Sequence, residues 1–177
     1  MMTLLRRPPL RMILVALVAL TIQTTFCATH RVANVTPNLM LILAISSGIV
    51  AGPEAGAFAG FFFGLAYDLT LATPLGLSAL TFAVCAYIVA VVKDSITVDQ
   101  AWWLTMLLGF GGSVAGIWLY AVAGTMVGQH GWIQHGLIKQ SIVVGLVNMM
   151  LALVLTKLQT WTLCAQRDIF KPTAQPL

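Results

Sequence analysis

Six apolar blocks, separated by short polar breaks, account for most of this sequence. The blocks cover residues 10–28, 37–51, 55–69, 75–92, 101–123 and 136–158. Apolar blocks of about 20 residues are typical of helices that span a bilayer. Only 8% of the residues are charged, so the chain lacks the polar side chains that would cover a water-facing surface. We therefore predict an all-α polytopic membrane bundle of six transmembrane helices.

A single membrane domain covers residues 1–177 in this prediction, with a short basic segment at 1–9 and a short polar tail at 159–177. The second and third blocks are short for a span. At about 1.5 Å per residue, each covers ~22 Å of a ~30 Å hydrocarbon core. Two arrangements fit this length: six full spans, or four spans with a re-entrant pair that the other helices surround.

The basic residues are distributed unevenly between the two sides of such a bundle. With six spans and a cytoplasmic N-terminus, seven of them fall on the cytoplasmic side and two on the other side. The seven are Arg6, Arg7, Arg11, Lys93, Lys157, Arg167 and Lys171, and the two are Arg31 and Lys139. Cytoplasmic loops are enriched in Lys and Arg, so both termini are predicted to be cytoplasmic. No basic run is dense enough to indicate nucleic-acid binding, which leaves the lipid bilayer as the expected surroundings.

A row of small residues runs through the third block. Gly56, Gly60 and Gly64 recur at every fourth position, and Asp68 continues the row. Residues four apart share one face of a helix, so the glycines would form a groove that Asp68 closes. Close packing against a neighbouring helix is the favoured interpretation, because such rows are common in membrane bundles. A groove for a ligand or a partner is the alternative.

A second row in the fifth block supports the packing interpretation. Gly112, Gly116 and Gly124 are spaced in multiples of four, with Tyr120 at the intervening step. Two grooved helices in one chain indicate a tightly packed bundle. In the sixth block, Asn148 is a buried polar residue whose expected role is a hydrogen bond between helices, worth about 0.6 kcal/mol on average.

Asp68 lies within the predicted hydrocarbon depth, where a charge at a helix centre costs about 2.5–3.5 kcal/mol. We therefore expect its carboxyl group to face the bundle interior. Its possible hydrogen-bond partners are Thr70, Thr73, Tyr120 and the backbone N–H groups that follow Pro74. A structural cap and a direct contact with a partner or ligand are both compatible with this position.

No residues have the arrangement of a catalytic site. An intramembrane aspartyl protease needs two membrane carboxyl groups, but the aspartates other than Asp68 lie in polar breaks or the tail. A serine nucleophile needs an adjacent base, and His130 and His135 lie in a polar break away from Ser78 and Ser113. The five-residue spacing of these histidines does not place both on one helical face. We predict no catalytic residue, no metal and no cofactor.

The segment from Pro53 to Asp68, together with the turn Pro74-Leu75-Gly76 and the apolar run that follows it, resembles the MreD family of rod shape-determining proteins. That family carries a glycine-spaced helix that ends in Gly-Leu-x-x-Asp, then a Pro-Leu-Gly turn and another apolar helix. The matching positions are Gly56, Gly60, Gly64, Asp68, Pro74 and Gly76. The rest of the chain agrees with the family in hydropathy, length, basic start and polar tail.

The resemblance implies a non-catalytic scaffold of the bacterial cell-elongation machinery in the inner membrane, where it supports peptidoglycan synthesis and cell shape. The implied direct partner is an MreC-type protein. Through the complex, the implied partners are MreB filaments, a RodA-type glycosyltransferase and a class-B penicillin-binding transpeptidase. The family also resembles the substrate-binding subunits of energy-coupling-factor transporters, which implies a six-helix bundle. A small-molecule-binding subunit of a vitamin-type transporter is therefore the alternative function.

Overall fold

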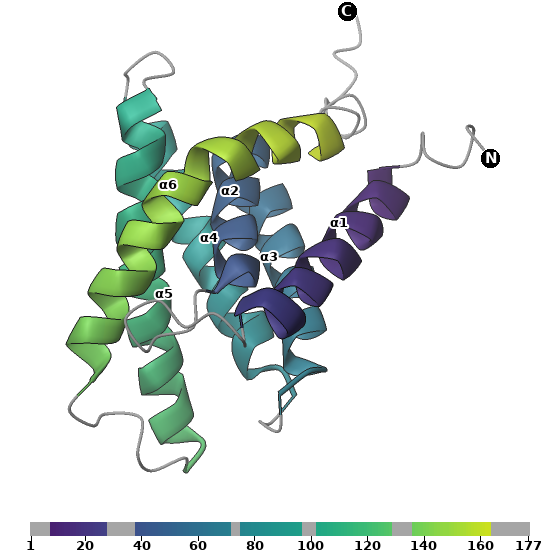
Figure 1. Ribbon diagram of the computed structural model, residues 1–177. Coiled ribbons are helices and arrows are strands. Elements are labelled where there is room, and N and C mark those ends of the chain that lie inside the picture. The colour runs from purple at the N-terminus through teal and green to yellow at the C-terminus, as the bar shows by residue number, and fades with distance from the viewer. Residues whose placement is uncertain (1–7, 28–37, 72–74, 97–101, 129–135, 164–177) are drawn as a thin grey trace, which may run out of the picture.

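The described part of the chain is entirely helical. A computed structural model describes residues 8–27, 38–71, 75–96, 102–128 and 136–163. Its elements are α1 (Pro8–Ile22) with a π-helical turn (Gln23–Cys27), α2 (Leu39–Ala51), α3 (Pro53–Asp68), α4 (Leu77–Ser95), α5 (Trp102–Met126) and α6 (Leu137–Leu163). Each predicted apolar block therefore overlaps one helix, and consecutive helices run in opposite directions (Figure 1). The all-α prediction is confirmed for these residues.

Three of the described helices are long and apolar enough to cross a membrane by length and composition. They are Leu77–Ser95, Trp102–Met126 and Leu137–Thr162. α2 has 13 residues and α3 has 16, which correspond to about 20 and 24 Å. The number of spans, six or four with a re-entrant pair, stays a prediction.

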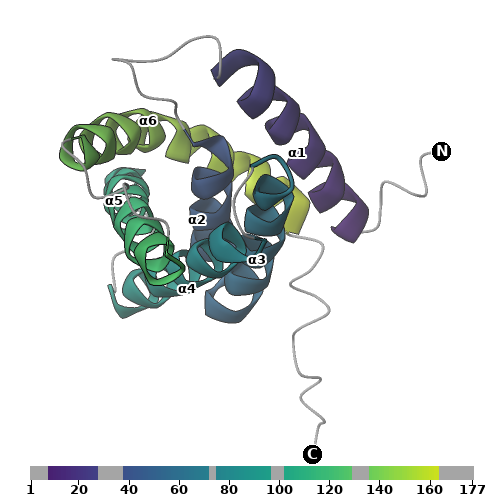
Figure 2. The same cartoon turned by 90° about the horizontal axis from the view of Figure 1, so that it is seen from below.

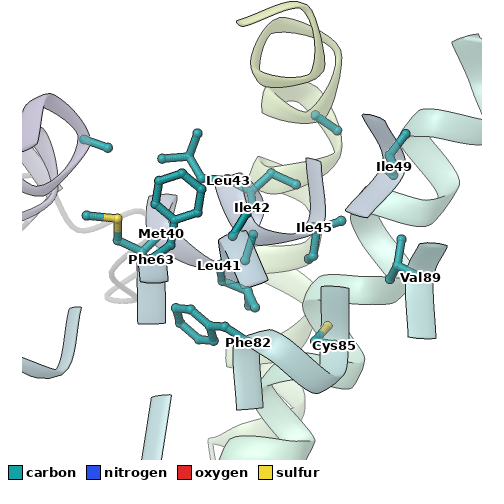
Figure 3. Close-up of a cluster of buried hydrophobic side chains, with 14 of the residues drawn as sticks. Met40, Leu41, Ile42, Leu43, Ile45, Ile49, Phe63, Phe82, Cys85 and Val89 are labelled. Carbon is teal, nitrogen blue, oxygen red and sulfur yellow. The ribbon is translucent and has the colours of Figure 1, made fainter. Parts of the chain in front are cut away.

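α2 lies at the centre of the bundle, and the other helices are arranged around it (Figure 2). All ten residues from Met40 to Ile49 are buried, Ser46 and Ser47 among them, as expected for a helix that is apolar on most of its sides. Figure 3 shows Met40 and Ile45 of α2 in one cluster with Phe63 of α3 and Val89 of α4. The core of the protein is therefore built around the shortest of the six α-helices that the structure describes.

Polar side chains accept hydrogen bonds from the backbone N–H groups at the N-terminal end of α2. The Asn38 side chain accepts a hydrogen bond from the Leu41 N–H at 3.1 Å, which caps the helix. Gln23, which follows α1, accepts from the Leu39 N–H at 2.7 Å. The first N–H groups of a helix have no partner within it, and in a bilayer they need one inside the protein. Gln23 thereby links α1 to the central helix.

The outward faces of the other five helices are apolar. In α6, exposed side chains recur at every fourth position: Ile138, Ile142, Leu146, Met150 and Val154. α1, α3, α4 and α5 also expose large apolar side chains, whereas α2 exposes none. A surface of this kind suits lipid, because water would not solvate it.

Candidate functional site

The glycine row of α3 begins at a tight turn from α2. Gly52 alone connects the two helices, with a φ of 89° that glycine tolerates best. Pro53 then starts α3, where its missing N–H costs nothing. One turn later, a methyl group added at Gly56 would lie 2.5 Å from the Cα of Gly48. α2 and α3 therefore cross glycine against glycine.

The next two glycines of the row face α4. A methyl group at Gly60 would lie 2.7 Å from the carbonyl oxygen of Phe82 and 3.1 Å from the Cβ of Ala86. At Gly64 it would lie 2.5 Å from the Cα of Ala79. Such close backbone approach increases dispersion contacts that lipid does not replace. In the described residues, α2 and α4 of the same chain fill the face that the sequence left open as a possible groove.

Asp68 ends α3, and its carboxyl group is buried, with 1% of the residue exposed. One oxygen accepts hydrogen bonds from the N–H groups of Gly76 at 2.8 Å and Ala79 at 3.2 Å. The other accepts from the N–H of Ser78 at 3.1 Å. These N–H groups belong to the start of α4 and have no partner within that helix. Asp68 thus caps the following helix, where the positive end of the helix dipole also favours a carboxyl group.

Backbone conformation explains why glycine stands at the entry to α4. Gly76 precedes the helix with a φ of 101°, which strains any residue with a Cβ. Gly76 has no side chain that could cap α4, so Asp68 supplies the cap from the end of α3. Of the partners predicted for Asp68, the N–H groups that follow Pro74 are those observed. Pro74 itself and Thr73 lie outside the described residues.

The second glycine row also faces the interior. A methyl group at Gly112 would lie 2.8 Å from Cγ2 of Val89 in α4 and 3.1 Å from Cδ1 of Ile45 in α2. At Gly116 it would lie 2.8 Å from Cδ1 of Leu41. Gly124 is buried farther along α5. The row therefore brings α5 against both the central helix and α4.

A polar contact joins α5 to α6. Asn148 donates a hydrogen bond from Nδ2 to Oγ of Ser113 at 2.8 Å, and both residues are fully buried. The Ser113 hydroxyl donates in turn to the carbonyl of Gly109 at 2.7 Å. Gly109 lies close to α6, because a methyl group there would be 2.7 Å from the Cβ of Ala152. Gly109 was not predicted from the sequence, because it faces α6 and does not belong to the four-residue spacing of Gly112, Gly116 and Gly124.

We expect the Asn148–Ser113 pair to stabilise the α5–α6 contact by about 0.6 kcal/mol, and by no more than about 1.7 kcal/mol. The check is a double-mutant cycle of Asn148→Ala, Ser113→Ala and the double variant, with unfolding followed in a denaturing detergent. The coupling between the two changes isolates the hydrogen bond. Strictly additive losses would contradict the pairing.

Two cations stabilise the end of the bundle that is opposite to Asp68. The Lys93 ammonium donates to the carbonyl of Ile49 at 2.5 Å, near the C-terminal end of α2. Arg11 donates to the carbonyl of Trp161 at 3.2 Å, and its guanidinium carbon lies 4.7 Å from the centre of that residue's ring. Carbonyl groups at a helix C-terminus attract cations. From the sequence alone we could predict on which side of the membrane Arg11 and Lys93 lie, but not which carbonyl groups they bind.

Metal-ligand geometry is not found in the described part of the chain. No group of three or more His, Cys, Asp or Glu residues is placed there to hold an ion. His130 and His135 lie outside the described residues.

A comparison with protein families places these features in context. The family model of the rod shape-determining protein MreD matches residues 7–162, which include α1 to α5 and all of α6 except its last residue. Searches among curated proteins and among solved structures gave no match. The matched range includes both glycine rows, Asp68 and Asn148.

Proposed function

Because this chain belongs to the MreD family of bacterial rod shape-determining membrane proteins, we propose that it is a non-catalytic scaffold of the cell-elongation complex. It would support peptidoglycan synthesis and cell shape by packing against partner membrane proteins. The observation that carries this proposal is that the residues matching the family motif hold α3 and α4 together. Gly60, Gly64 and Asp68 join α3 to α4 through backbone contacts and backbone hydrogen bonds, so the motif builds a rigid hairpin.

The direct partner in this proposal is an MreC-type protein. MreB filaments, a RodA-type glycosyltransferase and a class-B penicillin-binding transpeptidase would join through the complex. The apolar outward faces of α1, α3, α4, α5 and α6 support this, because a partner helix can replace lipid on such a face. The glycine rows contribute to partner binding by holding these faces in fixed positions.

The proposed topology has six spans in the inner membrane with both termini in the cytoplasm. Its support is that the Arg11–Trp161 pair and the Lys93–Ile49 contact both lie at the end of the bundle opposite to Asp68, since Lys and Arg are enriched on the cytoplasmic side and Trp at either interface. Asp68 then lies toward the periplasmic end. The short α2 tolerates this position because neighbouring helices surround it. A bundle of the kind found in substrate-binding subunits of energy-coupling-factor transporters is part of the same proposal.

The alternative function, a small-molecule-binding transporter subunit, required a groove along the glycine row. α2 and α4 occupy that face in the described residues. The alternative therefore gains no support from the site.

The scaffold proposal predicts a defined set of partners. We expect a tagged full-length chain, expressed in its bacterial host and solubilised in mild detergent, to co-purify with an MreC-type protein. Mass spectrometry of the eluate identifies the partner, and an unrelated tagged membrane protein of similar size serves as the control. Recovery of a transporter ATPase in place of the MreC-type protein would contradict the proposal.

A further inference from the structure

The start of α1 and the end of α6 meet at the end of the bundle that is opposite to Asp68 (Figures 1 and 2). Arg11 of α1 donates to the carbonyl of Trp161 at 3.2 Å, and its guanidinium carbon lies 4.7 Å from the centre of the Trp161 ring. Lys157 lies four residues before Trp161, so the two side chains share one face of α6. Arg11, Lys157 and Trp161 therefore form one group, which we call the α1–α6 basic cluster.

This cluster lies near the ends of two membrane helices. Arg11 is in the first turn of α1, and Trp161 is two residues before the end of α6. Lys157 is exposed, and so is 55% of Trp161. Tryptophan is enriched at membrane interfaces, and a lysine near the end of a membrane helix extends its ammonium group toward the headgroups. The α1–α6 basic cluster therefore faces the headgroup layer.

Apolar side chains continue this surface toward the centre of the bilayer. Leu14 lies one turn deeper than Arg11 in α1, and Leu158 lies one turn deeper than Trp161 in α6. Leu14 is 46% exposed and Leu158 is 37% exposed. The surface is thus cationic at the interface and apolar below it. A phospholipid has the complementary shape, with a phosphate at the interface and acyl chains in the hydrocarbon layer.

The charges at this end indicate which headgroup fits. A guanidinium carries five N–H donors in a fork that matches a phosphate, and the lysine adds a second positive charge. The described residues of α1 and α6 include no Asp or Glu, so no carboxylate on these two helices would attract the ammonium group of a zwitterionic lipid. Of the described acidic residues, Asp68 lies at the opposite end, and Glu54 and Asp94 belong to α3 and α4. The cluster therefore fits a headgroup with a net negative charge.

We propose that the α1–α6 basic cluster binds the phosphate of an anionic phospholipid, whose acyl chains lie against Leu14 and Leu158. Basic pockets between membrane helices bind lipid headgroups in this way. Because the cluster draws on both helices, the bound lipid bridges α1 and α6 and holds the first helix against the last. This site goes beyond the proposed scaffold function and requires no partner protein.

A lipid titration of the purified full-length protein tests the site. The protein in mild detergent is titrated with phosphatidylglycerol and, separately, with phosphatidylcholine that has the same acyl chains. Native mass spectrometry counts the lipids that stay bound. We expect phosphatidylglycerol to bind at least about fivefold more tightly, which corresponds to one basic residue acting on an anionic headgroup. Inorganic phosphate should not displace it, because it has no acyl chains.

Two lysine variants of α6 locate the binding site. Lys157→Gln removes one charge of the cluster, and the Lys157 side chain makes no hydrogen bond or ion pair within the described residues, so the fold should be kept. Lys139→Gln is the matched control, because Lys139 is an exposed lysine in the first turn of α6, at the other end of the same helix. We expect Lys157→Gln to bind phosphatidylglycerol about fivefold more weakly than the wild type. Lys139→Gln should bind it as the wild type does.

Three results would overturn the proposal. If Lys157→Gln and Lys139→Gln bind phosphatidylglycerol equally, the lipid responds to net charge alone and this cluster is not its site. If phosphatidylcholine binds the wild type as tightly as phosphatidylglycerol, the site does not select an anionic headgroup. If inorganic phosphate displaces the lipid, the cluster is a site for soluble phosphate. The scaffold function is unaffected by any of these results, since it is tested by co-purification.

Discussion

Gly64→Ala will destabilise the bundle by about 1–3 kcal/mol, whereas Gly111→Ala will leave its stability unchanged or slightly higher. Each change adds one methyl group to a helix interior. At Gly64 the new Cβ would lie 2.5 Å from the Cα of Ala79 and from the carbonyl oxygen of Ser78. These are backbone atoms, so the clash is relieved only if α3 and α4 move apart. The close contact between them is then lost.

Gly111 is the matched control because nothing lies within 4 Å of a Cβ built there. In an exposed helix interior, alanine is more favourable than glycine by roughly 0.5–1 kcal/mol. Unfolding of both variants in a denaturing detergent, with helix content followed by circular dichroism, gives the comparison. Equal stability of the two variants would show that α3 and α4 do not approach as closely as the structure has them.

The second large effect is expected at Asp68. Asp68→Leu removes the acceptor of three backbone N–H groups at the start of α4. A buried donor without a partner costs about 1–3 kcal/mol, so we expect a loss of at least about 3 kcal/mol. Rod shape will not be restored in cells that depend on this variant, and its level in the membrane will fall.

Asp68→Asn should be milder, with a loss of about 1–2 kcal/mol, because the amide keeps one oxygen as an acceptor. Asp94→Asn is the control, since Asp94 is exposed near the end of α4. The readouts are detergent unfolding, membrane abundance and rescue of rod shape. If Asp68→Asn loses shape rescue as completely as Asp68→Leu while its membrane abundance stays normal, the charge itself has a function beyond capping.

The helices and the glycine row were accessible from sequence because both depend on local periodicity. Blocks of apolar residues placed every helix, and the four-residue spacing placed Gly56, Gly60 and Gly64 on one face. Spacing cannot say what lies against a face, since that depends on helices far apart in the chain. The sequence therefore favoured a packed crossing and kept an open groove as the alternative, and the positions of α2 and α4 distinguish the two.

Residues that act across long sequence separations were the ones that sequence reasoning missed. Lys93 bonds a carbonyl 44 positions away, and Arg11 bonds one 150 positions away. Each was interpreted only as a marker of the membrane side. Gly145, which lies against Phe110 of α5, has no glycine four positions away in α6, so no periodicity marked it. By contrast, the cap from Asp68 could be predicted because the N–H groups that donate to its carboxyl group follow within 11 positions.

The central position of α2 has a consequence for biosynthesis. α2 is made early, yet the helices that cover it, α3 to α6, are synthesised after it. During translation it therefore sits in lipid or beside the translocation machinery with its faces uncovered, which a helix with only Ser46 and Ser47 as polar side chains tolerates. Its surroundings become final only when α6, the last helix, arrives. A ribosome that stalls before α6 would leave a nascent chain with an incomplete centre, and membrane quality control could recognise it by that exposed helix.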